Sequence, residues 1–297
     1  MSNLEYMNQE DGFLGVKEES QEIIDNAKVV IVPYGMESSS KLNTGTRTGP
    51  RAIIRASHQL EIFDEEYNIE TYKKIGIRTL CEQRMDYNAA NALNDIENII
   101  GNLLDNNKMP LILGGEQTLT SGAIRPFVKK YDDLAILHFD SRANLKDPEI
   151  DNNHSSLSSI RKITKHQISK IISCGIRSIS KEEKEFIDQN KDIFEVYYAK
   201  DRNKWNKKEI TNSLKGKKVY LTFDLSGFDS SVMAATGFPE PNGFFWPDAM
   251  RIIKQAAKVS DIVGIDIVEL APISFLYSCD ILAAKLAYKI LGHIFNQ

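Results

Sequence analysis

Apolar residues dominate two stretches of the chain, and each stretch ends in a group of short polar side chains. These are LAILHFDSRAN, at residues 134–144, and VYLTFDLSGFD, at residues 219–229. Apolar runs of this length are typical of strands buried on both faces of a parallel sheet. Since ligands of such sheets bind at the carboxyl ends of the strands, Asp140 and Asp224 mark a candidate crevice. Asp140 also fits a simpler role, as the residue that caps the turn after its strand.

Short apolar runs alternate with longer amphipathic segments along most of the chain. Further strands are predicted at residues 29–33, 110–113, 171–176, 194–198 and 262–270. The spacing of apolar residues predicts helices at residues 87–104, after Gln117 and at residues 276–295, and Pro50 suits the first turn of another. The polar segment at residues 147–159 is expected to wall a binding site. Strands that alternate with helices favour an α/β fold with a mostly parallel sheet covered on both faces.

Composition narrows the class of protein. The chain has 297 residues, 42% hydrophobic and 26% charged, without a linker, so we expect a single domain over 1–297, with residues 1–28 as an extension packing on it. A net charge of −4 without a basic cluster argues against nucleic-acid binding, and no apolar stretch is long enough for a membrane span. The cysteines, Cys81, Cys174 and Cys279, form no metal-binding pair, so a reduced cytoplasmic setting is expected.

Several motifs in these segments resemble those of a known family. GGEQTLT at residues 114–120, HFDSRANL at 138–145, FDLSGFDSS at 223–231 and TGFPEPNG at 236–243 are similar to signatures of the ureohydrolases, which include arginase and agmatinase. NTGTRTGPRAI, NNHSS, CGIRS and GIDIVELAP extend the resemblance nearly end to end. The resemblance implies a three-layer α/β/α fold with a parallel sheet of about eight strands. It also implies hydrolysis of a guanidino group to urea and an amine by hydroxide that bridges two manganese ions.

In that family six side chains hold the two ions, and this chain keeps part of the set. The corresponding positions are Gln117, Asp140, Arg142, Asn144, Asp224 and Ser226. Asp140 and Asp224 are ligands of the type that the resemblance implies. Two histidines and two carboxylates of the family are replaced at the other positions.

These replacements change the charge of the site. Two divalent cations bring four positive charges, which the family's four carboxylates balance. This chain offers two carboxylates together with Arg142, whose guanidinium stays protonated and has no lone pair to give a metal. We therefore expect no bridged manganese pair and at most one weakly bound divalent cation. We also expect Arg142 to pair with Asp140 or Asp224.

Two positions match the substrate side of the family's site. His154, in NNHSS, matches a histidine near the substrate amine in agmatinase-like members, and Glu269 matches the carboxylate that holds the guanidinium. Asp229 and Glu240 match framework or substrate-proximal positions. Structural roles fit these residues too, since a lone histidine after a polar loop or a carboxylate at a strand end is often a buried hydrogen-bonding partner.

The sequence therefore leaves three hypotheses. The first is a catalytically degenerate ureohydrolase-like protein, a pseudoenzyme that serves as a binding or regulatory subunit. Because the family forms trimers and hexamers, it would be a homo-oligomer or assemble with an active relative, and a small guanidino or amine ligand is a further candidate for the crevice. The second is an agmatinase-like hydrolase that cleaves a guanidino compound either without metal or with one metal ion. Asp140, Asp224 and neighbouring carbonyl groups would hold that ion. The third is a purely structural interaction protein.

Overall fold

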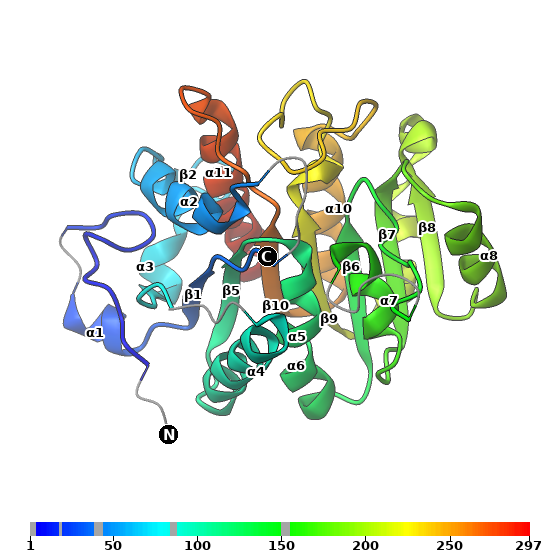
Figure 1. Ribbon diagram of the computed structural model, residues 1–297. Helices are drawn as coiled ribbons and strands as arrows, with labels where there is room; N and C mark the ends of the chain where they lie inside the picture. The colour runs from blue at the N-terminus through cyan, green and yellow to red at the C-terminus, as the bar shows by residue number, and fades with distance from the viewer. Residues whose placement is uncertain (1–3, 18–19, 39–43, 84–87, 150–154) are drawn as a thin grey trace.

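A computed structural model describes residues 4–17, 20–38, 44–83, 88–149 and 155–297. Its centre is an eight-stranded sheet in the order β4-β1-β5-β10-β9-β6-β7-β8 (Figure 1). All neighbouring strands in it are parallel. The strands are β1 (Val29–Tyr34), β4 (Ile77–Thr79), β5 (Met109–Gly114), β6 (Leu134–Phe139), β7 (Lys170–Ile176), β8 (Phe194–Tyr198), β9 (Lys218–Asp224) and β10 (Asp261–Val268). The predicted α/β fold is confirmed.

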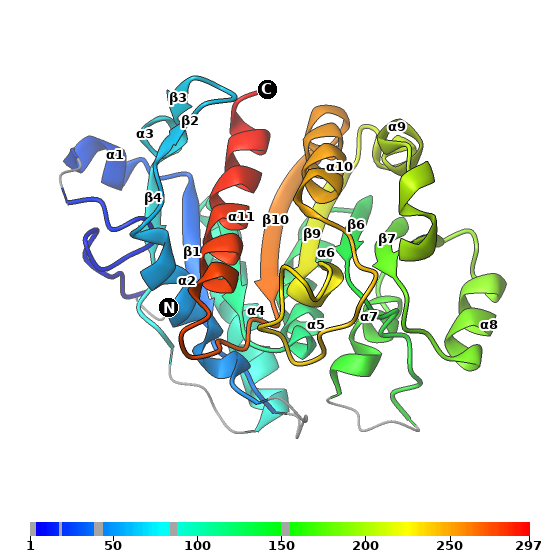
Figure 2. The ribbon, with the colours of Figure 1, turned by 90° about the horizontal axis from the view of Figure 1, so that it is seen from above.

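Helices cover both faces of the sheet and produce three layers (Figures 1 and 2). One core lies under α2 (Gly49–Ser57), α3 (Thr71–Ile75), α9 (Lys207–Ile210), α10 (Trp246–Val259) and α11 (Tyr277–Phe295). The other lies under α4 (Ala89–Asp105), α5 (Thr120–Ala123), α6 (Arg125–Lys130), α7 (Ser159–Ile163) and α8 (Lys181–Gln189). Successive strand residues point to opposite faces, so Ile31 belongs to the first core and Val30 and Val32 to the second. This explains why the strands are apolar throughout, instead of alternating between apolar and polar residues.

The structure departs from the predicted elements in a few places. The edge strand β4 was not predicted, nor was the antiparallel hairpin of β2 (Phe63–Asp64) and β3 (Ile69–Glu70). The helix predicted after Gln117 is divided into a 3₁₀ turn at Gln117–Leu119 and the short helices α5 and α6. Pro126 lies in the first turn of α6, where its missing N–H costs no helical hydrogen bond.

The N-terminal segment packs against the β4 edge of the sheet. Within residues 4–17, Phe13 and Leu14 are buried in the first core, and the Met7 amide donates to the Thr79 carbonyl at 2.8 Å. The short helix α1 (Gln21–Asp25) leads into β1. The division of the chain into one domain and an extension stays a prediction.

Close contacts between loops lock the carboxyl edge of the sheet. A Cβ added to Gly115 would lie 2.0 Å from the Met36 carbonyl oxygen, so the loops after β1 and β5 touch through this glycine. The Glu116 amide donates to the same oxygen at 2.8 Å, and the Glu269 amide donates to the Gly115 carbonyl at 2.7 Å. Three neighbouring strands thus present their loops as one rigid surface.

In the described part of the chain no helix is long and apolar enough to cross a membrane.

Candidate functional site

Four central strands bring the predicted polar residues together at the carboxyl edge. β5, β10, β9 and β6 are adjacent in the sheet. Gln117, Glu269, Asp224 and Asp140 stand at or just beyond their carboxyl ends, and all four are buried. The sequence placed these residues at one edge, and the parallel topology is what gathers them in space.

Both aspartates organise the turn that follows their own strand. Asp140 Oδ1 accepts a hydrogen bond from the Arg142 amide at 2.9 Å, and Asp224 Oδ1 accepts one from the Ser226 amide at 2.8 Å. A carboxylate that bonds a backbone amide two residues on makes a tight turn without glycine. The capping role considered for Asp140 from the sequence is therefore present, Asp224 has it as well, and in each case Oδ2 is left for other partners.

Asp140 is surrounded by hydrogen-bond donors. Its Oδ2 accepts from Asn144 Nδ2 at 2.6 Å and from His138 Nε2 at 3.1 Å, and its Oδ1 accepts from Ser226 Oγ at 3.2 Å. With the Arg142 amide this makes four donors around one buried carboxylate. Such a shell satisfies a charged carboxylate without a cation.

The side-chain amide of Gln117 fills the space between the two aspartates. In one orientation its oxygen accepts from Asn144 Nδ2 at 2.6 Å. Turned by 180°, its nitrogen donates to Asp140 Oδ2 at 2.7 Å and to Asp224 Oδ2 at 3.1 Å, and its oxygen accepts from His138 Nε2 at 3.2 Å. The second orientation gives both carboxylates a donor but sets the Gln117 nitrogen 2.6 Å from the Asn144 nitrogen, whereas the first gives the Asn144 N–H group an acceptor. In either orientation an amide group stands between the carboxylates.

Burial and like charge act together on Asp224. Burial raises the pKa of this carboxyl group well above its usual value, and the nearby charges of Asp140 and Glu269 raise the pKa further. Glu269 itself is fixed by a hydrogen bond that the backbone N–H of Gln117 donates to its Oε1 at 2.9 Å. Three carboxyl groups so close together favour the neutral form of the one with the fewest donors.

Arg142 does not pair with Asp140 or Asp224, contrary to the expectation from the sequence. Its guanidinium carbon lies 3.5 Å from the centre of the Phe238 ring, and its nearest carboxylate oxygen is Glu240 Oε1, 4.0 Å from Nη2. The backbone amide is bound to Asp140, which directs the side chain away from the aspartates toward the rim of the crevice. The positive charge thus lies at the rim rather than between the carboxylates.

His138 was given no role from the sequence, yet it takes part in this network. It lies on β6 and is fully buried. Its Nδ1 is 3.0 Å from Ser173 Oγ on β7, and its Nε2 faces Asp140 and Gln117. The available signal was a polar side chain inside an apolar strand, which is costly unless it has partners.

Of the remaining predicted residues, Asp229 and Glu240 lie at the rim. Asp229 accepts hydrogen bonds from the Ser231 and Gly243 amides at 3.0 and 2.9 Å, so it holds the loop that carries Glu240. This is a framework role. His154 falls outside the described residues.

Arg177, which was not singled out from the sequence, ties the rim to the sheet. Its guanidinium donates to six backbone carbonyl groups: those of Gly175, Ser226, Gly227, Phe228, Glu240 and Pro241, at 2.8–3.2 Å. Burial lowers the pKa of this guanidinium despite the neighbouring carboxylates. One side chain thereby joins the end of β7, the turn after β9 and the loop at residues 240–241.

The donor set at this edge does not fit a pair of manganese ions. It offers two carboxylates at the ligand positions, together with two amides, one hydroxyl and an arginine that points away. Within the described residues, no group of three or more His, Cys, Asp or Glu side chains is arranged to hold a metal. The cavity among Gln117, Asn144, Asp224 and Glu269 measures about 10 Å³, which is space for about one water.

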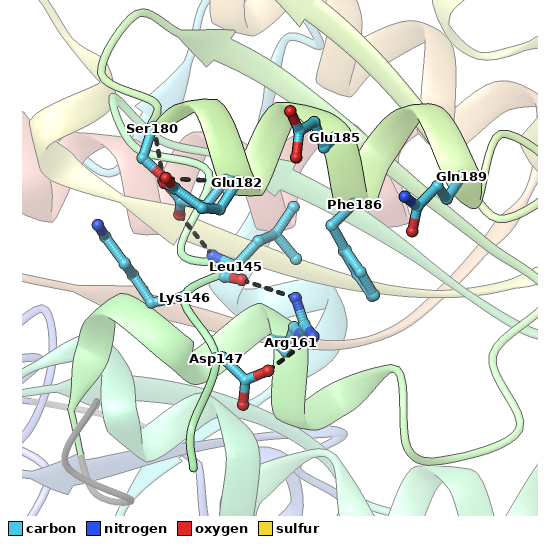
Figure 3. Close-up of a pocket in the computed structure, with 10 residues that line it drawn as sticks. Leu145, Lys146, Asp147, Arg161, Ser180, Glu182, Glu185, Phe186 and Gln189 are labelled. Atoms are coloured by element: carbon cyan, nitrogen blue, oxygen red, sulfur yellow. Dashed lines mark hydrogen bonds and ion pairs between the residues drawn. The ribbon is translucent and has the colours of Figure 1, made fainter. Parts of the chain in front are cut away.

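A second hollow lies outside this cluster, between α8 and the segment after β6 (Figure 3). It measures about 370 Å³. Arg161 stacks on Phe186 there, 3.9 Å from the ring centre, and its Nη2 donates to Asp147 Oδ2 at 3.1 Å. Glu183 closes a capping box with Ser180 and accepts from the Leu145 amide at 2.9 Å. Arg161, Asp147, Ser180 and Glu183 are therefore already paired within this hollow.

Comparison with known proteins gives matches over most of the chain. The model of the Arginase family matches residues 27–292. The chain is 28% identical to N(1)-aminopropylagmatine ureohydrolase of Synechocystis sp. over 276 residues, covering 90% of this chain and 89% of that protein. It is 31% identical to agmatinase of Bacillus cereus over 258 residues, covering 84% and 85%.

Solved structures agree with these matches. The crystal structure of agmatine ureohydrolase of Thermoplasma volcanium superposes with a TM-score of 0.84 at 25% identity, covering 96% of this chain and 94% of that one. Proclavaminate amidino hydrolase of Streptomyces clavuligerus superposes with a TM-score of 0.85, covering 96% and 97%, and at 18% identity this likeness concerns the fold alone.

Proposed function

The chain belongs to the arginase family, and from that premise we propose that it is a non-catalytic member that serves as a binding or regulatory subunit. The observation that carries the proposal is the surroundings of Asp140. Asn144, Ser226 and His138 direct N–H or O–H groups at its oxygens. A hard cation needs those same oxygen lone pairs, so it would have to displace three donors from a buried site.

The charge balance supports the same conclusion. Two manganese ions bring four positive charges, whereas the ligand positions of this site offer only two carboxylates, Asp140 and Asp224, to balance them. Amides and hydroxyls are weak ligands for manganese compared with the carboxylates and imidazoles of the family. Without a metal to lower the pKa of a bound water, the described residues supply no strong nucleophile beside Glu269.

The frame around the site supports a role in binding. Arg177, Asp229 and the loop contacts at Gly115 hold the rim in a defined shape. A rim of this kind presents a fixed surface to a ligand or to another chain. We propose assembly with copies of the same chain, as a trimer or hexamer, or with a catalytic relative.

The test is a paired assay of activity and assembly. Purified protein, loaded with manganese and dialysed, is assayed for urea release from agmatine, arginine and 4-guanidinobutanoate. We expect no release above a protein-free control, together with an oligomeric mass by light scattering. Turnover of any of these compounds would overturn the non-catalytic assignment, and a monomer at all concentrations would overturn the role as a subunit.

A further inference from the structure

The side chain of Arg142 has unused hydrogen-bonding capacity at the rim of the crevice. Its guanidinium face is covered by Phe238 at 3.5 Å, and stacking leaves the N–H groups at the edge of the plane available. Nε is buried and has no hydrogen-bond partner among the described residues. Among the described residues, the carboxylate nearest to the guanidinium is that of Glu240. Its Oε1 lies 4.0 Å from Nη2, beyond hydrogen-bonding distance.

Two other arginines near the same edge show how unusual this is. Arg161 also stacks on an aromatic ring, but its edge is occupied by Asp147 at 3.1 Å (Figure 3). Arg177 donates to six carbonyl groups. A buried guanidinium edge normally finds acceptors, because unsatisfied buried donors are costly. Arg142 is held in place by Phe238 and by its own backbone, with its donors left for a partner.

We propose that Arg142 binds the carboxylate of a small ligand at the rim of the crevice. A carboxylate matches the guanidinium edge with two parallel hydrogen bonds, and a stacked arginine loses little freedom on forming them. The side chain is 21% exposed, so a ligand reaches it from solvent. The cavity behind it, about 10 Å³, admits no guanidino group, so recognition takes place at the rim.

This inference rests on the proposed function in one respect, since it takes the crevice as a binding site that works without metal. It adds the class of ligand, a small carboxylic acid. Neighbouring Glu240 does not replace the ligand, because its Oε1 lies 4.0 Å from Nη2, too far for a hydrogen bond.

The experiment compares two ligands that differ at one end. 4-Guanidinobutanoate and agmatine share the guanidino group and the carbon chain, but one ends in a carboxylate and the other in an ammonium. Binding is measured by calorimetry in the presence of EDTA. We expect the wild-type chain to prefer 4-guanidinobutanoate by about tenfold or more, as a charge-assisted pair requires. Glutarate, which has no guanidino group, should compete with it.

Variants locate the effect. Arg142→Gln should remove the preference, Arg142→Lys should keep part of it, and Arg161→Gln is the control for loss of a stacked arginine elsewhere. Unchanged melting temperatures would show that the variants fold. Equal binding of the two ligands, no carboxylate binding at all, or a preference that survives Arg142→Gln would overturn the proposal. Urea release by manganese-loaded protein, assayed separately without EDTA, would instead contradict the proposed function and leave the carboxylate preference standing.

Discussion

Replacing Asn144 by aspartate tests whether hydrogen-bond donors, rather than a cation, neutralise the buried carboxylates. Asn144→Asp keeps the size and shape of the side chain. The backbone also accepts it, since residue 144 has φ = 53° and aspartate, like asparagine, tolerates this left-handed conformation. Only the chemistry changes, because an amide nitrogen that donates to Asp140 Oδ2 at 2.6 Å becomes a carboxylate oxygen.

The cost follows from the contact that is inverted. Loss of the donor leaves a buried acceptor under-satisfied, which costs about 1–3 kcal/mol. A second carboxylate against Asp140 adds the penalty of an uncompensated buried charge, for a total of about 3–5 kcal/mol. We therefore expect Asn144→Asp to lose about 3–5 kcal/mol of unfolding free energy at pH 7 without metal.

The assay is urea denaturation followed by circular dichroism, with and without manganese. Asn106→Asp is the matched control, because Asn106 donates to the Asn102 carbonyl at 2.8 Å on an exposed helix end. That change should cost only about 1 kcal/mol, from a negative charge at the C-terminal end of α4. A loss below about 1 kcal/mol at Asn144, or full recovery on adding manganese, would refute the reasoning, since the position would then behave as a metal ligand.

Three further predictions concern other parts of the fold. Arg177→Met should destabilise the chain by about 3 kcal/mol or more, because six carbonyl groups each lose a donor, and Arg177→Lys should cost less; denaturation midpoints measure both. Burial lowers the pKa of His293 to about 4, so stability should fall as pH drops from about 6.5 toward 4, where only the unfolded chain takes up the proton; in His293→Gln this part of the pH profile should flatten. Phe275 is 89% exposed with φ = 69°, and Phe275→Asn should raise stability by about 1 kcal/mol in a thermal melt; a lower melting temperature would show that the ring makes a contact that matters.

Most of the sheet was predictable because its strands are buried on both faces. Residues 134–139 and 219–223 are apolar almost throughout, and both form strands. β4 was missed because three residues, of which Arg78 is only partly buried, carry no apolar run. The helix after Gln117 was predicted as one element, whereas Pro126 restarts it as a separate helix.

The site was predictable in position but not in contacts. Topology alone places Asp140 and Asp224 at one edge, since both end adjacent parallel strands. The direction of Arg142 depends on backbone geometry after the strand, where the Asp140 carboxylate binds its amide, and on the position of Phe238, 96 residues later in the chain. Neither can be derived from local sequence. The role of His138 was missed because its partner Ser173 comes from a different strand.

The most direct test of the central claim is the manganese content of the chain at equilibrium. The wild-type protein is dialysed against micromolar manganese, and the bound metal is counted by mass spectrometry. The control carries Gln117→His, Arg142→His, Asn144→Asp and Ser226→Asp together, which restores the donor types of the family. We predict fewer than one manganese ion per wild-type chain and a gain in the restored variant. Two manganese ions per wild-type chain would contradict the account, because hydrogen-bond donors could not then be what neutralises Asp140.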